Sequence, residues 1–285
     1  MYDQFITLPD PTTVLFQAGP VALRIYALEI GPVLIRWYAL GYIFGLLGGW
    51  WYARRLVANT SLWTVQPGTP AQLDDLLIWV TLGVVLGGRL GQVLLYAPGY
   101  YFANPWEIPQ IWHGGMAFHG GLIGATLAIV VYAWANRIPV LSYLDVISAV
   151  APFGIFLVRI ANFINGELWG RETTDVPWAM IFSDPEAGGV PRHPSQLYEA
   201  ATEGILLFVV LLALTRLGGL KRPGLIAGVF GLGYAAARSF CEQYREPDGW
   251  AIKELLTIGQ AYSLPMAIIG IGLILNAFLR KPQPA

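Results

Sequence analysis

The chain has 285 residues, of which 55% are hydrophobic and only 12% are charged, and its net charge is −1. A soluble domain with so few charged side chains could not cover its surface with polar groups, and a chain this apolar does not stay disordered. The near-neutral charge gives no electrostatic basis for binding nucleic acid. The single cysteine excludes an intramolecular disulfide and a cysteine metal cluster. The composition therefore predicts a protein that crosses a membrane several times.

Seven segments are long and apolar enough to be membrane helices, which need about 20 residues each. In chain order they are 31–53, 73–95, 115–136, 143–164, 196–216, 223–242 and 258–280. Glycines four positions apart, such as Gly83 with Gly87 and Gly120 with Gly124, predict close packing between helices. We therefore expect an all-α polytopic membrane protein in which residues 1–285 form a single integral membrane domain.

The basic residues outside these spans predict the orientation. They divide eight to five between the two sides of the membrane, and the richer side includes the C-terminus. The positive-inside rule then predicts a cytoplasmic C-terminus. Because the number of spans is odd, the N-terminal segment 1–30 is expected to be extracytoplasmic. The longer loops lie on that side too, and we expect 165–195 to form a small head there.

Several ionisable side chains lie inside the predicted spans, where a charge costs several kcal/mol and therefore indicates a function. Four are arginines: Arg36, Arg89, Arg159 and Arg238. Others at a similar depth are His119, Glu199, Glu203 and Glu242. At 1.5 Å per residue, the arginines lie roughly 6–9 Å from the outer boundary. An ion pathway would distribute charges through the membrane, whereas a single outer layer favours a site for an anionic lipid headgroup.

Simpler interpretations exist for each of these residues. An arginine near a helix end can reach the headgroups without any further role. Glu199 and Glu203 share one helix face and are interpreted as ion-pair partners that hold arginines in place. Cys241 has no motif around it that would lower its pKa, so it is expected to be a small packed residue. His113 and His119 have no carboxylate at ligand spacing, and no metal or cofactor is predicted.

One stretch closely resembles a known signature. Residues 159–171, with the sequence RIANFINGELWGR, resemble the signature of the bacterial prolipoprotein diacylglyceryl transferases. Further stretches similar to motifs of that family are 36–38, 115–124, 193–199 and 234–248. Val158 and Ala161 stand where the family usually has glycine, which alters packing and leaves the ionisable positions unchanged. The resemblance extends over about residues 31–280.

The resemblance implies a transfer reaction in the bacterial cytoplasmic (inner) membrane, with the active site toward the extracytoplasmic side. The family moves the diacylglyceryl group of phosphatidylglycerol to a cysteine thiol. That cysteine lies in the lipobox of a preprolipoprotein signal peptide. The products are a thioether-linked lipid and glycerol 1-phosphate, and the step is the first in lipoprotein maturation. The implied partners are therefore phosphatidylglycerol, the signal peptide and membrane lipid, with no nucleic acid.

Three residues are expected to carry the chemistry. The thiolate is the attacking species, and His119 is our candidate for the base that takes the thiol proton. The lipid phosphate, or a thiol pKa lowered by arginine, are alternatives to His119. Arg159 and Arg238 are expected to bind the phosphate and to stabilise the charge that develops on the leaving group.

A second set of residues is expected to line the substrate site. Asn162 lies one turn after Arg159 and would hydrogen-bond the headgroup. Tyr234 precedes Arg238 by one turn and would orient it or touch the phosphate, while Glu242 would pair with Arg238. The remaining candidates are Tyr38 in the same pocket, Glu167 and Gly170 at its mouth, and Arg245 in the last motif.

Three other functions compete with this one. A transporter would need polar residues or broken helices at the membrane midplane. Another enzyme acting on anionic phospholipid headgroups would usually show an acidic metal cluster or a histidine nucleophile motif. A membrane scaffold would not need a one-sided layer of charge.

Overall fold

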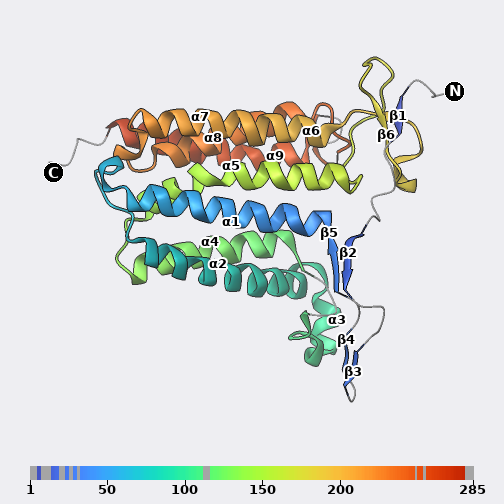
Figure 1. The fold of residues 1–285 in the computed structure, drawn as a ribbon, viewed down its shortest axis with the longest axis horizontal. Helices are drawn as coiled ribbons and strands as arrows, with labels where there is room; N and C mark the ends of the chain where they lie inside the picture. Colours follow the sequence, from blue (N-terminus) through green and yellow to red (C-terminus); the bar gives the residue numbers. More distant parts are fainter. Residues whose placement is uncertain are drawn as a thin grey trace.

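The structure is a computed structural model that describes residues 5–7, 14–18, 23–25, 28–30, 33–111, 116–247, 249–252 and 255–279. The side chains of residues 14–39 and of Tyr42, Leu95, Phe118, His119, Leu122, Trp250 and Ala251 lie outside this description. Long helices lie side by side along one axis and make up most of the molecule (Figure 1).

Seven long helical segments overlap the seven predicted spans. They are α1 (Trp37–Ala58), α2 (Pro70–Gly91) continued by the π-helix η2 (Gln92–Tyr96), α4 (Phe118–Ala135), α5 (Val140–Ile164), the run α6 (Ser195–Glu199), η6 (Ala200–Leu206) and α7 (Leu207–Arg216), α8 (Leu225–Cys241) and α9 (Ile258–Leu279). Among the residues that the structure describes, four helical stretches, 70–94, 140–164, 195–216 and 258–279, are long and apolar enough to cross a membrane. Shorter apolar stretches occupy 123–135 in α4 and 225–241 in α8.

The protein is mostly helical, but its connections contain short helices and strands that were not predicted. The short helices are η1 (Thr60–Leu62), α3 (Pro98–Ala103), η3 (Pro105–Glu107), η5 (Pro185–Ala187) and η7 (Gly219–Lys221). The strands are β1 (Ile6–Thr7), β2 (Val14–Ala18), β3 (Leu23–Ile25), β4 (Leu28–Ile30), β5 (Val33–Arg36), β6 (Met180–Ile181), β7 (Pro191–Arg192), β8 (Trp250–Ile252) and β9 (Leu256–Thr257). Strands this short carry too few residues for a readable alternating pattern.

The strands pair mainly within loops. β6 lies between β1, which runs parallel to it, and β7, which runs antiparallel. Antiparallel pairs join β2 to β5, β3 to β4 and β8 to β9. Since β5 occupies the start of the predicted span 31–53, the first long helix begins later, at Trp37. β1, β6 and α3 lie toward the same end of the bundle (Figure 1).

Glycines allow α2 and α4 to pack closely, as predicted. A Cβ atom on Gly87 would collide with the backbone of Gly120 and Gly124, and one on Gly83 would collide with Gly124. The resulting pair of helices is tied to α1 at one end, where Asp74 accepts hydrogen bonds from Trp50 Nε1 at 2.7 Å and Arg54 Nη1 at 2.8 Å.

The start of α8 depends on a carboxylate from α5. Gly224 precedes the helix with a φ of +92°, a conformation that L side chains rarely adopt. The fully buried Asp145 accepts hydrogen bonds from the backbone N–H of Gly224 at 2.7 Å and of Ala227 at 2.8 Å. Asp145 therefore caps α8 across 79 positions of sequence and fixes its register against α5.

Candidate functional site

Arg159 in α5 forms a forked contact with two glutamates of the α6–η6 run. Its Nε and Nη2 atoms donate to Oε2 of Glu203 at 3.2 and 3.0 Å. Its Nη1 lies 3.2 Å from Oε2 of Glu199. Both glutamate side chains are fully buried, whereas 12% of the Arg159 side chain is exposed. Arg159 is thus a nearly buried cation with two counter-charges.

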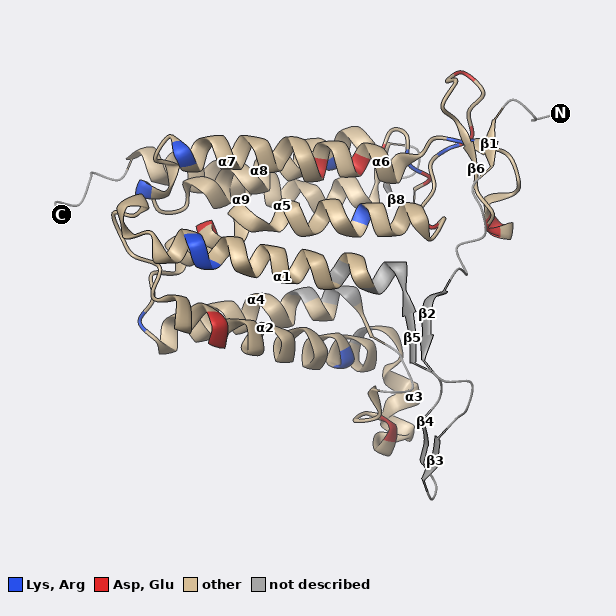
Figure 2. Ribbon diagram, in the orientation of Figure 1, with Lys and Arg blue, Asp and Glu red and all other residues tan. Residues whose placement is uncertain are grey.

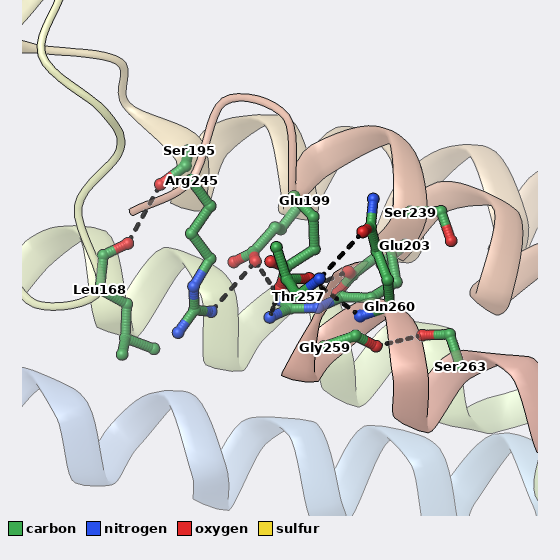
Figure 3. A network of polar contacts seen from close by, with 12 residues as sticks. Leu168, Ser195, Glu199, Glu203, Ser239, Arg245, Thr257, Gly259, Gln260 and Ser263 are labelled. Atoms are coloured by element: carbon green, nitrogen blue, oxygen red, sulfur yellow. Dashed lines mark hydrogen bonds and ion pairs between the residues drawn. The ribbon is translucent and has the colours of Figure 1, made fainter. Parts of the chain in front are cut away.

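Arg238 in α8 approaches the same two glutamates from the other side. Its Nη1 donates to Oε1 of Glu199 at 2.5 Å and lies 3.9 Å from Oε1 of Glu203. Its Nη2 bonds Oε1 of Glu242, one turn later in the chain. Arg245 Nη1 adds a second contact to Oε1 of Glu199, at 3.2 Å. Figure 3 shows Glu199 and Arg245 pointing toward one another.

Together these six side chains form one charge network, which we call the Arg–Glu network. Its members are Arg159, Glu199, Glu203, Arg238, Glu242 and Arg245. In it, Glu199 and Glu203 form ion pairs with arginines, and Glu242 pairs with Arg238. It brings together four of the predicted site residues: Arg159, Arg238, Glu242 and Arg245.

The charges of the Arg–Glu network balance, but its hydrogen bonds do not. Three guanidinium groups face three carboxylates. In the described structure, three buried carboxylate oxygens accept no hydrogen bond: Glu199 Oε2, Glu203 Oε1 and Glu242 Oε2. The first two still lie 3.2 and 3.9 Å from an arginine nitrogen. A buried acceptor without a donor costs about 1–3 kcal/mol. The network therefore has acceptor atoms free for a hydrogen-bond donor, such as a hydroxyl group.

The glutamates are presented by an unusual helix. Glu199 ends α6, and Glu203 lies in the π-helix η6. π-helical turns inside α-helices are rare and occur frequently at functional sites. A Cβ on Gly204 would meet Phe156 of α5 at 2.7 Å, so the small residue lets η6 lie directly against the helix that carries Arg159. The wider turn and this close approach bring both glutamates to the arginines.

The second group of predicted residues lies where α5 ends. Asn162 Nδ2 donates to Oε1 of Glu167 at 2.6 Å, and Gln196 Nε2 donates to the carbonyl of Glu167, also at 2.6 Å. Gln196 precedes Glu199 on α6, so these bonds link the end of α5 to the helix that begins the Arg–Glu network. Gln196 was not predicted, although it lies in a stretch that matches a family motif.

Gly170 lies where three chain segments cross: its own, the one that contains His193 and the one that contains Tyr244. Its N–H donates to the carbonyl of His193 at 3.0 Å, and a Cβ there would collide with the carbonyls of His193 and Tyr244. The next residue, Arg171, donates from Nε to the carbonyl of Arg245 at 3.0 Å and from Nη2 to that of Glu242 at 3.4 Å. Arg171, the last residue of the signature, thus ties this segment to the one that carries Glu242 and Arg245, a contact that was not predicted.

His193 belongs to an aromatic cluster beside this crossing. Its Nδ1 lies 3.1 Å from Tyr198 Oη, which also accepts from Trp178 Nε1 at 2.7 Å. Its ring packs edge-on against Tyr244, with centroids 5.2 Å apart. Burial lowers the pKa of His193, and the negative charge of Asp175 partly opposes that shift. His193 therefore favours its neutral form.

Arg89 has a different environment from the other arginines. It donates from Nε to the carbonyl of Ile108 at 2.7 Å, and its Nη2 bonds the carbonyl of Glu107. Its guanidinium also lies 4.9 Å from the ring centroid of Tyr101 in α3. Arg89 lies in the last turn of α2. Figure 2 shows that the acidic residues of the α6 region lie on a different part of the bundle from α2. Arg89 anchors the loop after α2. Its predicted depth in the membrane, similar to that of Arg159 and Arg238, therefore did not mean that it belongs to the Arg–Glu network.

The remaining predicted residues have separate outcomes. The side chains of Tyr38, Arg36 and His119 lie outside the described residues, as does His113. Tyr234 packs against Phe230, with ring centroids 6.0 Å apart. Cys241 is buried, as predicted, with its Sγ 3.2 Å from Thr202 Oγ1. Among the residues that the structure describes, no cluster of three or more metal-ligating side chains is found.

Comparison with known proteins adds the family. A family model described as prolipoprotein diacylglyceryl transferase matches residues 16–276. Proteins named phosphatidylglycerol–prolipoprotein diacylglyceryl transferase are similar over most of their length. One from Methylocella silvestris is 52% identical over 90% of this chain and 95% of its own. Others are from Rhizobium meliloti (54%, covering 87% and 90%) and Gluconacetobacter diazotrophicus (47%, covering 96% and 95%).

Proposed function

Because the chain belongs to the prolipoprotein diacylglyceryl transferase family, we propose that it transfers the diacylglyceryl group of phosphatidylglycerol to the thiol of a lipobox cysteine. A carbon–sulfur bond forms at the glycerol carbon that bears the phosphate ester. The carbon–oxygen bond to the phosphate breaks, and glycerol 1-phosphate leaves. The thiol proton passes to a base. The observation that carries the proposal is the buried Arg–Glu network in a member of this family.

The membrane arrangement is part of the proposal. The apolar helices and the family make the chain a multi-pass membrane protein. We place seven helices across the cytoplasmic (inner) membrane, with the N-terminus outside and the C-terminus in the cytoplasm. The Arg–Glu network then lies in the outer part of the bilayer, on the side of the loops that contain β6 and β7. That is where the headgroup of an outer-leaflet lipid and an exported signal peptide both meet the enzyme.

Arg159 and Arg238 would bind the lipid phosphate. A guanidinium presents donors in a fixed fork that fits phosphate oxygens, and it keeps its charge when buried. Each arginine is already oriented by carboxylates, with Arg159 at 3.0 Å from Glu203 and Arg238 at 2.5 Å from Glu199. In a low-dielectric site, such fixed donors stabilise the phosphate charge that develops as the carbon–oxygen bond breaks.

His119 is proposed as the base that removes the thiol proton. The support is its residue type, since imidazole titrates near neutral pH, and its place at the start of α4. The lipid phosphate and a thiol pKa lowered by the neighbouring arginines are the alternatives. A His119→Gln variant distinguishes these possibilities. If His119 is the base, its loss lowers the rate of transfer more than it lowers the affinity for the lipid.

Other residues would complete the substrate site. Asn162 is held by Glu167 and has a buried Oδ1 without a hydrogen-bond donor in the described structure, so it would meet the headgroup. Gly170 and Glu167 would shape the mouth of the site, and Arg245 would hold Glu199. Tyr38 and Tyr234 are proposed as lipid contacts.

The test is a transfer assay with purified protein. Phosphatidylglycerol and a lipobox peptide with one cysteine are incubated together, and the peptide is weighed by mass spectrometry. A mass gain of one diacylglyceryl group that is absent with a Cys→Ser peptide and with phosphatidylethanolamine would establish the reaction, donor and nucleophile. No gain from folded protein that still binds lipid would reject the proposal and reopen the possibility of another headgroup enzyme or a transporter.

A further inference from the structure

An apolar cavity of about 360 Å³ separates the α2–α4 pair from α1 and α5. Its walls are leucine, isoleucine, valine, alanine and glycine side chains with one tryptophan, and none of its lining residues is ionisable. A cavity without polar partners does not hold ordered water well. Its chemistry is that of a site for a hydrocarbon ligand.

The cavity leads toward the Arg–Glu network. On α5 its lining begins at Ile147 and ends at Val158, the residue directly before Arg159. At 1.5 Å per residue this stretch of helix is about 16 Å long. Half of the hydrocarbon core of a bilayer is about 15 Å thick. The cavity is therefore about as long as one leaflet is thick, and because its lining on α5 ends at the residue before Arg159, roughly 6–9 Å below the outer boundary, it extends past the midplane of the bilayer.

Hydrogen bonds join the helices at the far end of the cavity. Trp50, which lines it, donates to Asp74 at 2.7 Å, and Arg54 bonds the same carboxylate at 2.8 Å. Tyr143 Oη donates to the carbonyl of Gln72 at 3.1 Å across the same helices. These bonds tie α2 to α1 and α5 below the cavity.

The size of the cavity selects the ligand. A signal-peptide helix is about 10–12 Å wide, and a 16 Å length of it occupies about 1,200 Å³ or more. This exceeds the free space of the cavity. A single hydrocarbon chain is narrow enough. We infer that the cavity between α1, α2, α4 and α5 binds one acyl chain of the phospholipid whose phosphate is held at Arg159. The inference rests on the proposed function for the position of the headgroup.

Two glycines in the lining make the inference testable. A Cβ on Gly154 would meet nothing within 4 Å, and one on Gly49 would only touch Val150 at 4.0 Å. Gly49 faces Val150, one helical turn farther from Arg159 than Gly154 is. A Cβ at either position meets no backbone atom within 4 Å, so a leucine there is expected to extend into the cavity, and leucine favours a helix more than glycine does. Gly272 in α9 is a matched control, because its Cβ also meets nothing and it does not line the cavity.

The experiment measures kcat/KM for dioctanoyl, dilauroyl and dipalmitoyl phosphatidylglycerol with Gly154→Leu, Gly49→Leu and Gly272→Leu. We expect the kcat/KM of Gly154→Leu to fall about tenfold or more for the dipalmitoyl lipid and to stay within about twofold of wild type for the dioctanoyl lipid. The reason is that each methylene group kept out of the apolar site lowers the affinity about fourfold. Gly49→Leu should accept dilauroyl chains that Gly154→Leu rejects. Gly272→Leu should follow wild type throughout.

A second measurement separates this inference from the proposed function. Stabilisation of the folded protein by each lipid is followed by thermal unfolding, which needs no turnover. One possible outcome is that wild type makes no thioether, while dipalmitoyl phosphatidylglycerol stabilises wild type and does not stabilise Gly154→Leu. The proposed function then fails and the acyl-chain site stands. If Gly154→Leu and Gly272→Leu share one chain-length profile in both measurements, the inference is overturned.

Discussion

Arg159 and Glu203 lie 44 positions apart in the sequence and meet through two hydrogen bonds to a single oxygen, Glu203 Oε2, at 3.2 and 3.0 Å. The carboxylate is fully buried, so its charge depends on the arginine, and the arginine depends on it for orientation. This mutual dependence means that single substitutions here change both stability and chemistry. The following prediction separates the two effects.

Arg159→Ala should destabilise the protein by about 3–5 kcal/mol, because it leaves a buried carboxylate without its partner. The double variant Arg159→Ala/Glu203→Gln removes both charges and should recover part of that loss. Transfer should remain at least about a hundredfold below wild type in both variants, since neither has the phosphate donor. Thermal unfolding and the transfer assay on the same samples check this. Recovery of activity in the double variant would show that Arg159 acts only through Glu203.

Asp145→Ala should lower the thermal stability by removing the cap of α8. Two buried N–H groups, those of Gly224 and Ala227, lose their acceptor, and each loss costs about 1–3 kcal/mol. Asp145→Asn keeps one acceptor oxygen and should lie between wild type and alanine. Thermal unfolding in detergent is the measurement. An Asn variant no more stable than the Ala variant would contradict the role of the cap.

Gly170→Ala should reduce stability and transfer together. The new methyl group would collide with the carbonyls of His193 and Tyr244, so the crossing of the three segments must open. Overpacking of this kind typically costs 1–3 kcal/mol. Gly99→Ala is the control, since a Cβ there meets nothing within 4 Å. Equal unfolding temperatures for the two variants would show that the crossing tolerates the methyl group.

Acid should destabilise the protein partly through His193. Burial lowers its folded pKa below the ordinary value of 6.5, so the unfolded chain binds the proton first as the pH falls. The stabilising contribution of neutral His193 is complete above about pH 6.5 and is lost as the pH falls through the folded pKa. The difference in unfolding temperature between pH 7 and pH 5 should therefore be smaller in His193→Gln. An unchanged difference would assign the acid sensitivity to other groups.

Much of the helical layout was predictable from sequence, because long apolar segments have few alternatives in a membrane. The pairing of Glu199 and Glu203 with arginines was also readable, since residues four apart share a helix face. Depth alone was a weaker guide. It grouped Arg89 with Arg159, whereas Arg89 bonds the loop carbonyls of Glu107 and Ile108.

Features that depend on contacts distant in sequence could not be predicted in the same way. The π-helix η6 leaves no periodic signal that distinguishes it from the α-helices around it. The bond between Asp145 and Gly224 joins positions 79 apart, and one charge in an apolar span does not indicate its partner. Arg171 bonds backbone carbonyls, which every residue possesses, so no residue type in the sequence marks its target.

The sequence separation of the Arg–Glu network has a consequence for biogenesis. The chain is synthesised from its N-terminus, so Arg159 reaches the membrane 44 residues before Glu203, and Glu199 arrives 39 residues before Arg238. Each charge thus enters an apolar environment ahead of its counter-charge, where it is costly alone. Helix α5 must therefore stay beside the point of insertion until α6 follows. The arrival of α8, whose start is capped by Asp145, and of Arg245 directly after it closes the network before α9 follows.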